Sequence, residues 1–73
     1  MNAKAGQIWE IKEHIRIAKH FMFSHVFITK IEENKKTGDV VYYDILGPLH
    51  ELQYRETNSY LSWLIANCDL VSG

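Results

Sequence analysis

The sequence predicts a small, mainly β domain with one short helix near the C-terminal end. Two runs of β-branched and aromatic residues in Val26–Leu46 flank a polar turn that contains Gly38, which is the pattern of a β-hairpin. A hydrophobic content of 47% with a single proline indicates a packed globule. With 73 residues, the chain is expected to form one domain over residues 1–73, with a thin core.

Residues 7–23 fit two patterns. On a period of two, one face carries Trp9, Ile11, Ile15, Ile17, Phe21 and Phe23. On a helical period, one stripe carries Ile8, Ile11, Ile15, Ala18 and Met22. The Ile, Phe and Trp content, and the lack of an N-cap residue before Ile8, favour extended structure with a bend or loop within residues 12–20. The alternative is an α+β fold, in which an N-terminal helix packs on a three-stranded antiparallel sheet beside the C-terminal helix.

The central hairpin is predicted to pair residues 25–32 with residues 40–46. In the first of these strands, Val26 and Ile28 are expected on one face, and Phe27 and Ile31 on the other. Apolar residues on both faces indicate a strand that is covered from two sides or that curls around a small barrel. Two residues favour a turn between the strands. Asn34 can form a hydrogen bond with the local backbone, and Gly38 adopts a positive φ without steric cost.

A weaker strand, a helix and a last strand are expected after Gly47-Pro48. Residues 49–56 alternate, with Leu52 and Tyr54 predicted to face the core. The candidate N-caps of the helix are Thr57, Asn58 and Ser59. The apolar stripe of the helix consists of Leu61, Leu64, Ile65 and Cys68. A short strand is predicted at residues 70–71.

Four segments of the chain form a recognisable layout: Gly6-Gln7-Ile8-Trp9, the Val26–Glu32 strand, Val40-Val41-Tyr42-Tyr43, and the closing segment from Ser59-Tyr60-Leu61 to Leu70-Val71. This layout resembles that of a broad group of small, mostly uncharacterised bacterial and bacteriophage proteins. Such proteins are similar in layout to SH3-like barrels. The resemblance implies about five short strands with a helical turn before the last one, and a habit of binding. It implies no catalytic residue.

Several kinds of chemistry have little support in the sequence. The net charge of −1 is not that of a general nucleic-acid binder, which usually has a strong basic excess. Glu32 and Glu33 are neighbours, so on a strand they point to opposite faces and cannot act as an acid–base pair. The histidines and Cys68 lack the compact spacing of a zinc site. No enzyme activity, metal or cofactor is therefore predicted.

The expected location is the cytoplasm, or the host cytoplasm if a phage encodes the chain. The apolar runs are far shorter than the roughly 20 residues that span a bilayer, so no membrane association is predicted. The N-terminal residues lack the apolar core of a signal peptide. The single cysteine fits a reducing compartment.

A protein-binding or adaptor module is the leading functional hypothesis, with a host factor as the partner if the source is a phage. Its candidate contacts are the aromatic residues Tyr42, Tyr54 and Trp63, because Tyr and Trp dominate binding hot spots. The alternative is a small RNA- or DNA-binding barrel that uses the basic and aromatic segment 12–25. Its candidate contacts are Lys12, Arg16, Lys19, His20 and Phe23. A homo-oligomer that forms through the apolar stretch 15–23 is a third hypothesis.

Overall fold

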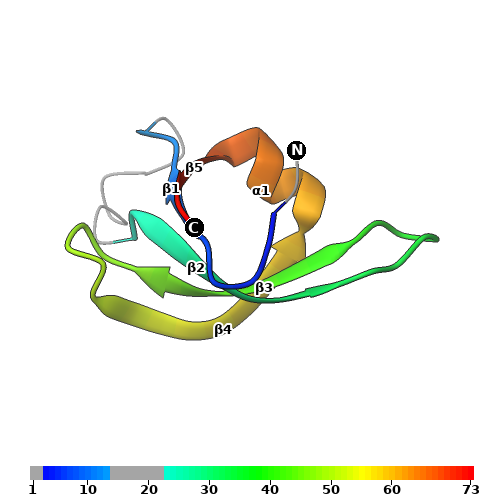
Figure 1. Cartoon of the computed structure of the whole chain (residues 1–73), viewed down its shortest axis with the longest axis horizontal. Coiled ribbons are helices and arrows are strands. Elements are labelled where there is room, and N and C mark those ends of the chain that lie inside the picture. The colour runs from blue at the N-terminus through cyan, green and yellow to red at the C-terminus, as the bar shows by residue number, and fades with distance from the viewer. Residues whose placement is uncertain (1–2, 14–22) are drawn as a thin grey trace.

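The structure, a computed structural model, describes residues 3–13 and 23–73. Within these residues the elements are β1 (Ile8–Ile11), β2 (His25–Glu32), β3 (Val40–Leu46), β4 (Leu52–Tyr60), α1 (Leu61–Asn67) and β5 (Cys68–Ser72). The five strands form one open antiparallel sheet in the order β4-β3-β2-β1-β5 (Figure 1). The prediction of a mainly β fold with one short helix before the last strand is therefore confirmed.

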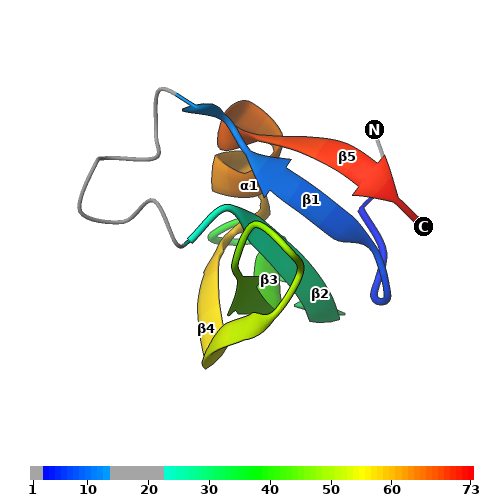
Figure 2. The same ribbon diagram turned by 90° about the vertical axis from the view of Figure 1, so that its left-hand side faces the viewer.

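The sheet is strongly curved, and the β2–β3 hairpin projects from it. In Figure 1, β2, β3 and β4 lie below α1, and the turn between β2 and β3 extends as an arm along the longest axis. The view in Figure 2 shows β1 and β5 side by side above β2 and β3. The molecule measures 35 × 22 × 20 Å along its principal axes. The turn between β3 and β4 lies at the opposite end from the arm.

The core lies between the concave side of the sheet and α1. Alternate residues of β1, of β3 and of the first half of β2 point into it, as the pleat requires. The buried cluster consists of Trp9, Ile11, Val26, Ile28, Val41, Tyr43, Leu64 and Cys68. The indole N–H of fully buried Trp9 donates to the Oε1 atom of Gln7 at 3.1 Å. The polar atom of the largest core side chain is therefore satisfied inside the fold.

The central hairpin has the predicted bounds, but its side-chain alternation does not hold along β2. The register of β2 and β3 shifts between Ile28 and Lys30, which leaves Thr29 as the extra residue of a β-bulge. The Thr29 hydroxyl donates to the carbonyl of Tyr42 at 3.2 Å. Because the bulge reverses the alternation, Ile31 packs against the core cluster. The expectation that Ile31 shares a face with Phe27 is therefore wrong.

The N-terminal segment forms a strand where the structure describes it. Trp9 and Ile11 are buried on one face of β1, as the period of two predicts. Residues 8–11 pair with both β2 and β5, so the helical alternative is wrong over this stretch. Residues 14–22 lie outside the described residues. They include most of the segment 12–20, in which a bend or loop was predicted, and all of the apolar stretch 15–23 except Phe23.

The junction of β4 and α1 differs from the prediction. Thr57, Asn58 and Ser59 continue β4, and the N-cap of α1 is Tyr60, which makes no side-chain capping bond. Ser59 instead pairs with Val41 in the ladder, so strand pairing wins over capping at these positions.

The expected inward residues of this region are also only partly buried. Leu52 and Tyr54 are 45% and 57% exposed, so the prediction that they face the core is wrong. In the helical stripe, Leu64 is fully buried and Ile65 is 37% exposed. Cys68 is buried as predicted, but as the first residue of β5. The last strand is longer than the predicted residues 70–71.

Among residues 3–13 and 23–73, no helix has both the length and the apolar character that crossing a membrane requires.

Candidate functional site

The basic segment predicted to contact nucleic acid is described only at its two ends. Lys12 follows β1, is half-buried, and donates its backbone N–H to the carbonyl of Asn67 at 2.8 Å. Phe23 is half-buried and lies just before β2. Arg16, Lys19 and His20 lie outside the described residues, so their role stays a prediction.

Trp63, one of the predicted aromatic anchors, packs towards the core. Its ring is stacked on that of Tyr43, with the centroids 6.2 Å apart and the planes within 4° of parallel. The Tyr43 hydroxyl shares a hydrogen bond of 2.7 Å with the hydroxyl of Ser59. Burial raises the pKa of Tyr43, and the bond to Ser59 opposes that effect in part. Trp63 therefore stabilises the contact between α1 and the sheet.

Tyr42 and Tyr54 lie on the outside of the sheet but do not form one surface with Trp63. Tyr42 alternates with the buried residues of β3. The Lys30 ammonium lies over its ring, 5.2 Å from the ring centroid. Lys30 also pairs with Glu32 at 3.4 Å. Tyr54 is more than half exposed near the turn between β3 and β4. The predicted anchors therefore occupy three separate places.

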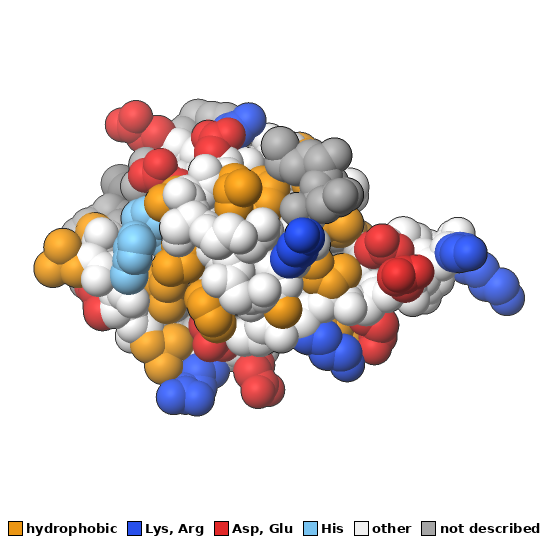
Figure 3. Space-filling view, in the orientation of Figure 1, with side chains coloured by type: hydrophobic (Ala, Val, Ile, Leu, Met, Phe, Trp, Pro, Cys, Tyr) orange, Lys and Arg blue, Asp and Glu red, His pale blue; other side chains and the backbone are white. Residues whose placement is uncertain are grey.

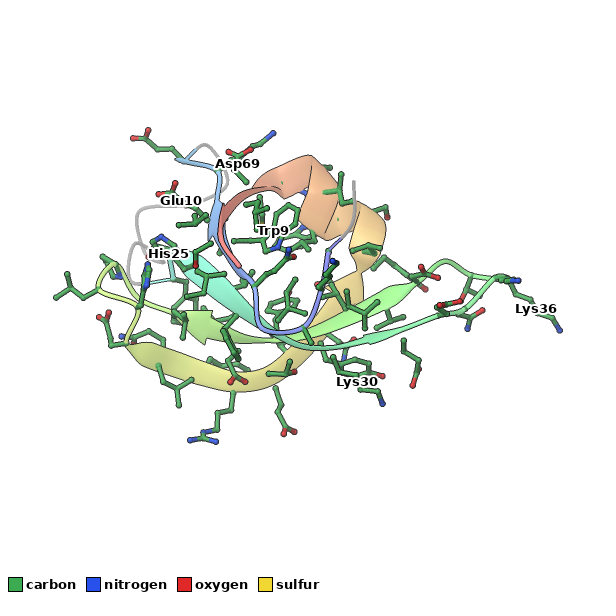
Figure 4. The ribbon with its side chains drawn as sticks, viewed as in Figure 1. Trp9, Glu10, His25, Lys30, Lys36 and Asp69 are labelled. Atoms are coloured by element: carbon green, nitrogen blue, oxygen red, sulfur yellow. The ribbon has the colours of Figure 1, made fainter. Side chains whose placement is uncertain are left out.

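Two of the four histidines meet beside the acidic side chains of β1 and β5. The rings of His25 and His50 are 4.6 Å apart in an edge contact, and His25 Nδ1 shares a hydrogen bond of 2.7 Å with the Ser24 hydroxyl. Glu10 lies opposite His25 in the ladder, and Asp69 lies opposite Glu10 (Figure 4). Among residues 3–13 and 23–73, no group of three or more His, Cys, Asp or Glu side chains is placed to hold a metal ion.

A groove lies between the base of the β2–β3 arm and α1. It has a volume of about 390 Å³, and its lining residues are Gly38, Asp39, Leu61, Ser62, Ile65 and Ala66. The lining is mostly apolar. One wall comes from the end of the hairpin turn and the other from the first two turns of α1. Ile65, which the helical stripe predicted to be buried, is open to solvent at the groove.

A backbone hydrogen bond holds the two walls of the groove together. The N–H of Leu61, the first residue of α1, donates to the carbonyl of Asp39 at 2.8 Å. This N–H has no partner within the helix, because it belongs to the first turn. The hairpin therefore supplies the contact that a capping side chain would otherwise make, and it fixes the width of the groove.

Tyr60 lines a second hollow near the base of the arm. The second hollow has a volume of about 320 Å³, and its lining residues are Thr37, Val40, Asn58, Ser59 and Tyr60. The Tyr60 side chain is 54% exposed. A Cβ atom at Gly38 would lie 3.9 Å from the Cδ1 atom of Tyr60, so the ring packs over this glycine. Tyr60 therefore lines the second hollow and lies beside Gly38, a residue of the groove.

The tip of the arm is fixed by hydrogen bonds to Asn34. Its Oδ1 atom accepts the backbone N–H groups of Lys36 and Thr37 at 3.0 and 3.2 Å. Its own N–H donates to the Oδ1 atom of Asp39 at 3.1 Å. The turn therefore holds its backbone in place without help from the rest of the sheet. Lys35 and Lys36 are both exposed, and Lys36 lies at the end of the arm (Figure 4).

The sequence did not indicate the groove. Its two walls are more than 20 residues apart along the chain, and only the pairing of β3 with β4 and the position of α1 bring them together. The one feature of the sequence that could have indicated the groove is Ile65, an apolar residue of the helix that the small core does not accommodate.

Comparison with known proteins gives no indication of function, so the geometry of the described residues is the basis for a proposal. Searches against protein-family models, curated proteins and solved structures found no match for this chain. The residues at the base of the arm therefore carry the functional proposal.

Proposed function

We propose that this chain is a non-enzymatic protein-binding module and that the groove beside Ile65 receives a side chain of its partner. The observation that supports this most is an open, mostly apolar groove whose two walls are tied together by the Leu61–Asp39 hydrogen bond. Binding sites are typically concave, largely preformed and lined by apolar side chains with a few polar groups. The exposed Tyr60 beside the groove supplies the kind of aromatic residue that is enriched in hot spots.

The size of the groove suits one or two partner side chains. Complete burial of a Leu, Ile or Phe side chain contributes about 1.5–3 kcal/mol. A micromolar complex requires about 8 kcal/mol, so one such side chain is not enough. The partner has to continue over Tyr60 or along the arm. An extended segment of a protein fits this requirement better than a small molecule does.

The curved sheet is proposed to be an SH3-like barrel. The strand order β4-β3-β2-β1-β5, with α1 between β4 and β5, supports this assignment. So does the core between the concave side of the sheet and α1. An experimental structure in which β1 and β5 lie flat beside β2, without curving over the core, would contradict it.

A phage origin, a host factor as the partner and a location in the host cytoplasm belong to the same proposal. They are supported by the layout of the sequence, which resembles small bacterial and bacteriophage proteins, and by the lone cysteine. Nucleic-acid binding through residues 12–25 is the competing hypothesis. Of its five candidate residues, the structure describes Lys12 and Phe23.

The test is capture of partners by three forms of the protein. Ile65→Glu places a charge in the groove, whereas Leu49→Glu makes the same change at an 88% exposed position on the β3–β4 turn, at the other end of the molecule. We expect wild type and Leu49→Glu to retain the same protein partners from a bacterial lysate, and Ile65→Glu to lose them. Circular dichroism checks that both variants are folded.

Three results would contradict the proposal. The first is equal capture by all three forms, because the groove would then play no part. The second is capture of nucleic acid that disappears with added salt, which would favour the competing hypothesis. The third is a mass that rises with concentration equally in all three forms, since self-association would then use another surface.

A further inference from the structure

The charges on the arm indicate the kind of protein segment that the groove receives. We infer that the partner segment carries an acidic residue within a few positions of the apolar residue that enters the groove. This inference rests on the proposed function and specifies the chemistry of the partner. It follows from the position of Lys35 and Lys36 relative to the groove, and from the state of the acidic groups around them.

Lys35 and Lys36 lie close to the groove along the chain. Gly38 and Asp39 form the hairpin wall of the groove, so Lys36 is only two residues beyond it. An extended segment advances about 3.3 Å per residue, so a partner that leaves the groove along the arm reaches the lysines within three or four residues. The bonds from Asn34 to the Lys36 and Thr37 N–H groups fix the backbone that carries them.

The nearby acidic groups are mostly engaged in other contacts. The Asp39 carboxylate accepts the Asn34 N–H at 3.1 Å, and Glu32 pairs with Lys30 at 3.4 Å. Residues 30–39 carry three basic and three acidic side chains, so the arm as a whole has no net charge. The positive charge is local to the tip, where Lys35 and Lys36 are adjacent and exposed. In Figure 3, basic side chains (blue) lie at the far end of the arm, and acidic side chains (red) lie closer to the body of the molecule.

A partner of this chemistry complements both parts of the surface. An apolar side chain removes water from the groove, and a carboxylate near Lys35 and Lys36 adds attraction and sets the direction of the segment along the arm. Contacts between exposed charges are weak and are screened by salt. They therefore contribute more to the specificity for a partner than to the affinity. Replacing an attractive contact with a repulsive one is expected to change affinity by roughly tenfold at low salt.

The experiment selects binders from a library of random dodecapeptides on four forms of the full chain. Wild type is compared with Lys36→Glu at the tip, Ile65→Glu in the groove, and Arg55→Glu. Arg55 is exposed on β4, away from the arm, so this variant matches the charge change of Lys36→Glu. Peptides enriched on each form are then resynthesised, and their affinities are measured by fluorescence anisotropy at low and high salt.

We expect wild type and Arg55→Glu to enrich peptides that combine an apolar residue with Asp or Glu. Lys36→Glu should bind those peptides roughly tenfold more weakly at low salt and should enrich Lys or Arg in their place. Ile65→Glu should enrich neither class. Added salt should reduce the difference between wild type and Lys36→Glu.

Two other results are informative in different ways. Peptides that depend on Ile65 but show no acidic preference, or that bind Lys36→Glu as well as wild type, would overturn the inference and leave the proposed function standing. If wild type and Ile65→Glu enrich the same peptides, or neither enriches any, both the proposed function and the inference fail.

Discussion

The surroundings of Cys68 determine its chemistry. The side chain is 2% exposed at the start of β5, and its own N–H donates to the carbonyl of Leu64. Burial raises the pKa of the thiol to about 12, and the charge of Asp69 adds to this effect. The thiol is therefore protonated at neutral pH, and because the thiolate is the reactive form, it is a poor nucleophile. The apolar stripe predicted a buried Cys68 with an unperturbed thiol. The burial is correct, but the thiol is not unperturbed, because burial raises its pKa.

The raised pKa makes the stability of the fold depend on pH in the alkaline range. The unfolded chain releases the Cys68 proton near pH 9.0, whereas the folded protein holds it to about pH 12. The stabilising contribution is complete below pH 9.0 and is lost as the pH rises towards 12. We expect the free energy of unfolding of wild type to fall more steeply over this range than that of Cys68→Ala. Urea titrations in alkaline and neutral buffers measure both slopes, and equal slopes would contradict the pKa.

The bounds of the two hairpin strands depend on local residues and were predicted from the sequence. Features that depend on the register between strands were not. The bounds of β2 and β3 follow from their apolar runs and from the turn chemistry between them. The bulge at Thr29 was not predictable, because it depends on the pairing with β3. The role of Ser59 was missed for the same reason. Its hydroxyl, which was a candidate to cap the helix, instead shares a cross-strand hydrogen bond with the Tyr43 hydroxyl.

The turn of the arm depends on the conformation of Gly38. Its φ angle is +100°, which strains any residue with a Cβ atom. We expect Gly38→Ala to lower the free energy of unfolding by about 1 kcal/mol, because the position favours glycine even though a Cβ would only touch Tyr60. Thr37→Ala, one position away, is the control and should change stability by less than about 0.5 kcal/mol. Urea unfolding measures both, and equal stability of Gly38→Ala and wild type would rule out this role for the glycine.

Few residues hold α1 to the sheet. Leu64 is the buried residue of the helix, and Trp63 and Leu61 pack against the core cluster from partly exposed positions. The helical pattern predicted a wider apolar contact that included Ile65. A sheet this small covers only part of the stripe, and the remainder forms the wall of the groove. The groove was therefore not predictable, because the size of the core emerges only when all the elements are packed together.

Leu64 and Ile65 provide a direct comparison of buried and exposed helix positions. A domain of 73 residues has a stability of roughly 4–11 kcal/mol. We expect Leu64→Ala to remove about 2–5 kcal/mol of this, because it deletes fully buried groups and leaves a cavity. Ile65→Ala should cost about 1 kcal/mol or less. Chemical denaturation of both variants tests this, and equal losses would show that α1 does not pack as described.

The two outer strands of the sheet have irregular registers. The pairing of β3 with β4 shifts on both sides of Ile45, and that of β1 with β5 shifts between Ile8 and Trp9. Irregular pairing twists an outer strand away from the flat geometry that another chain needs in order to add to it. We therefore expect the protein to remain dispersed at high concentration instead of growing into fibres. It also follows that a partner has to be recognised through side chains, because the borders of the sheet offer no straight backbone to extend.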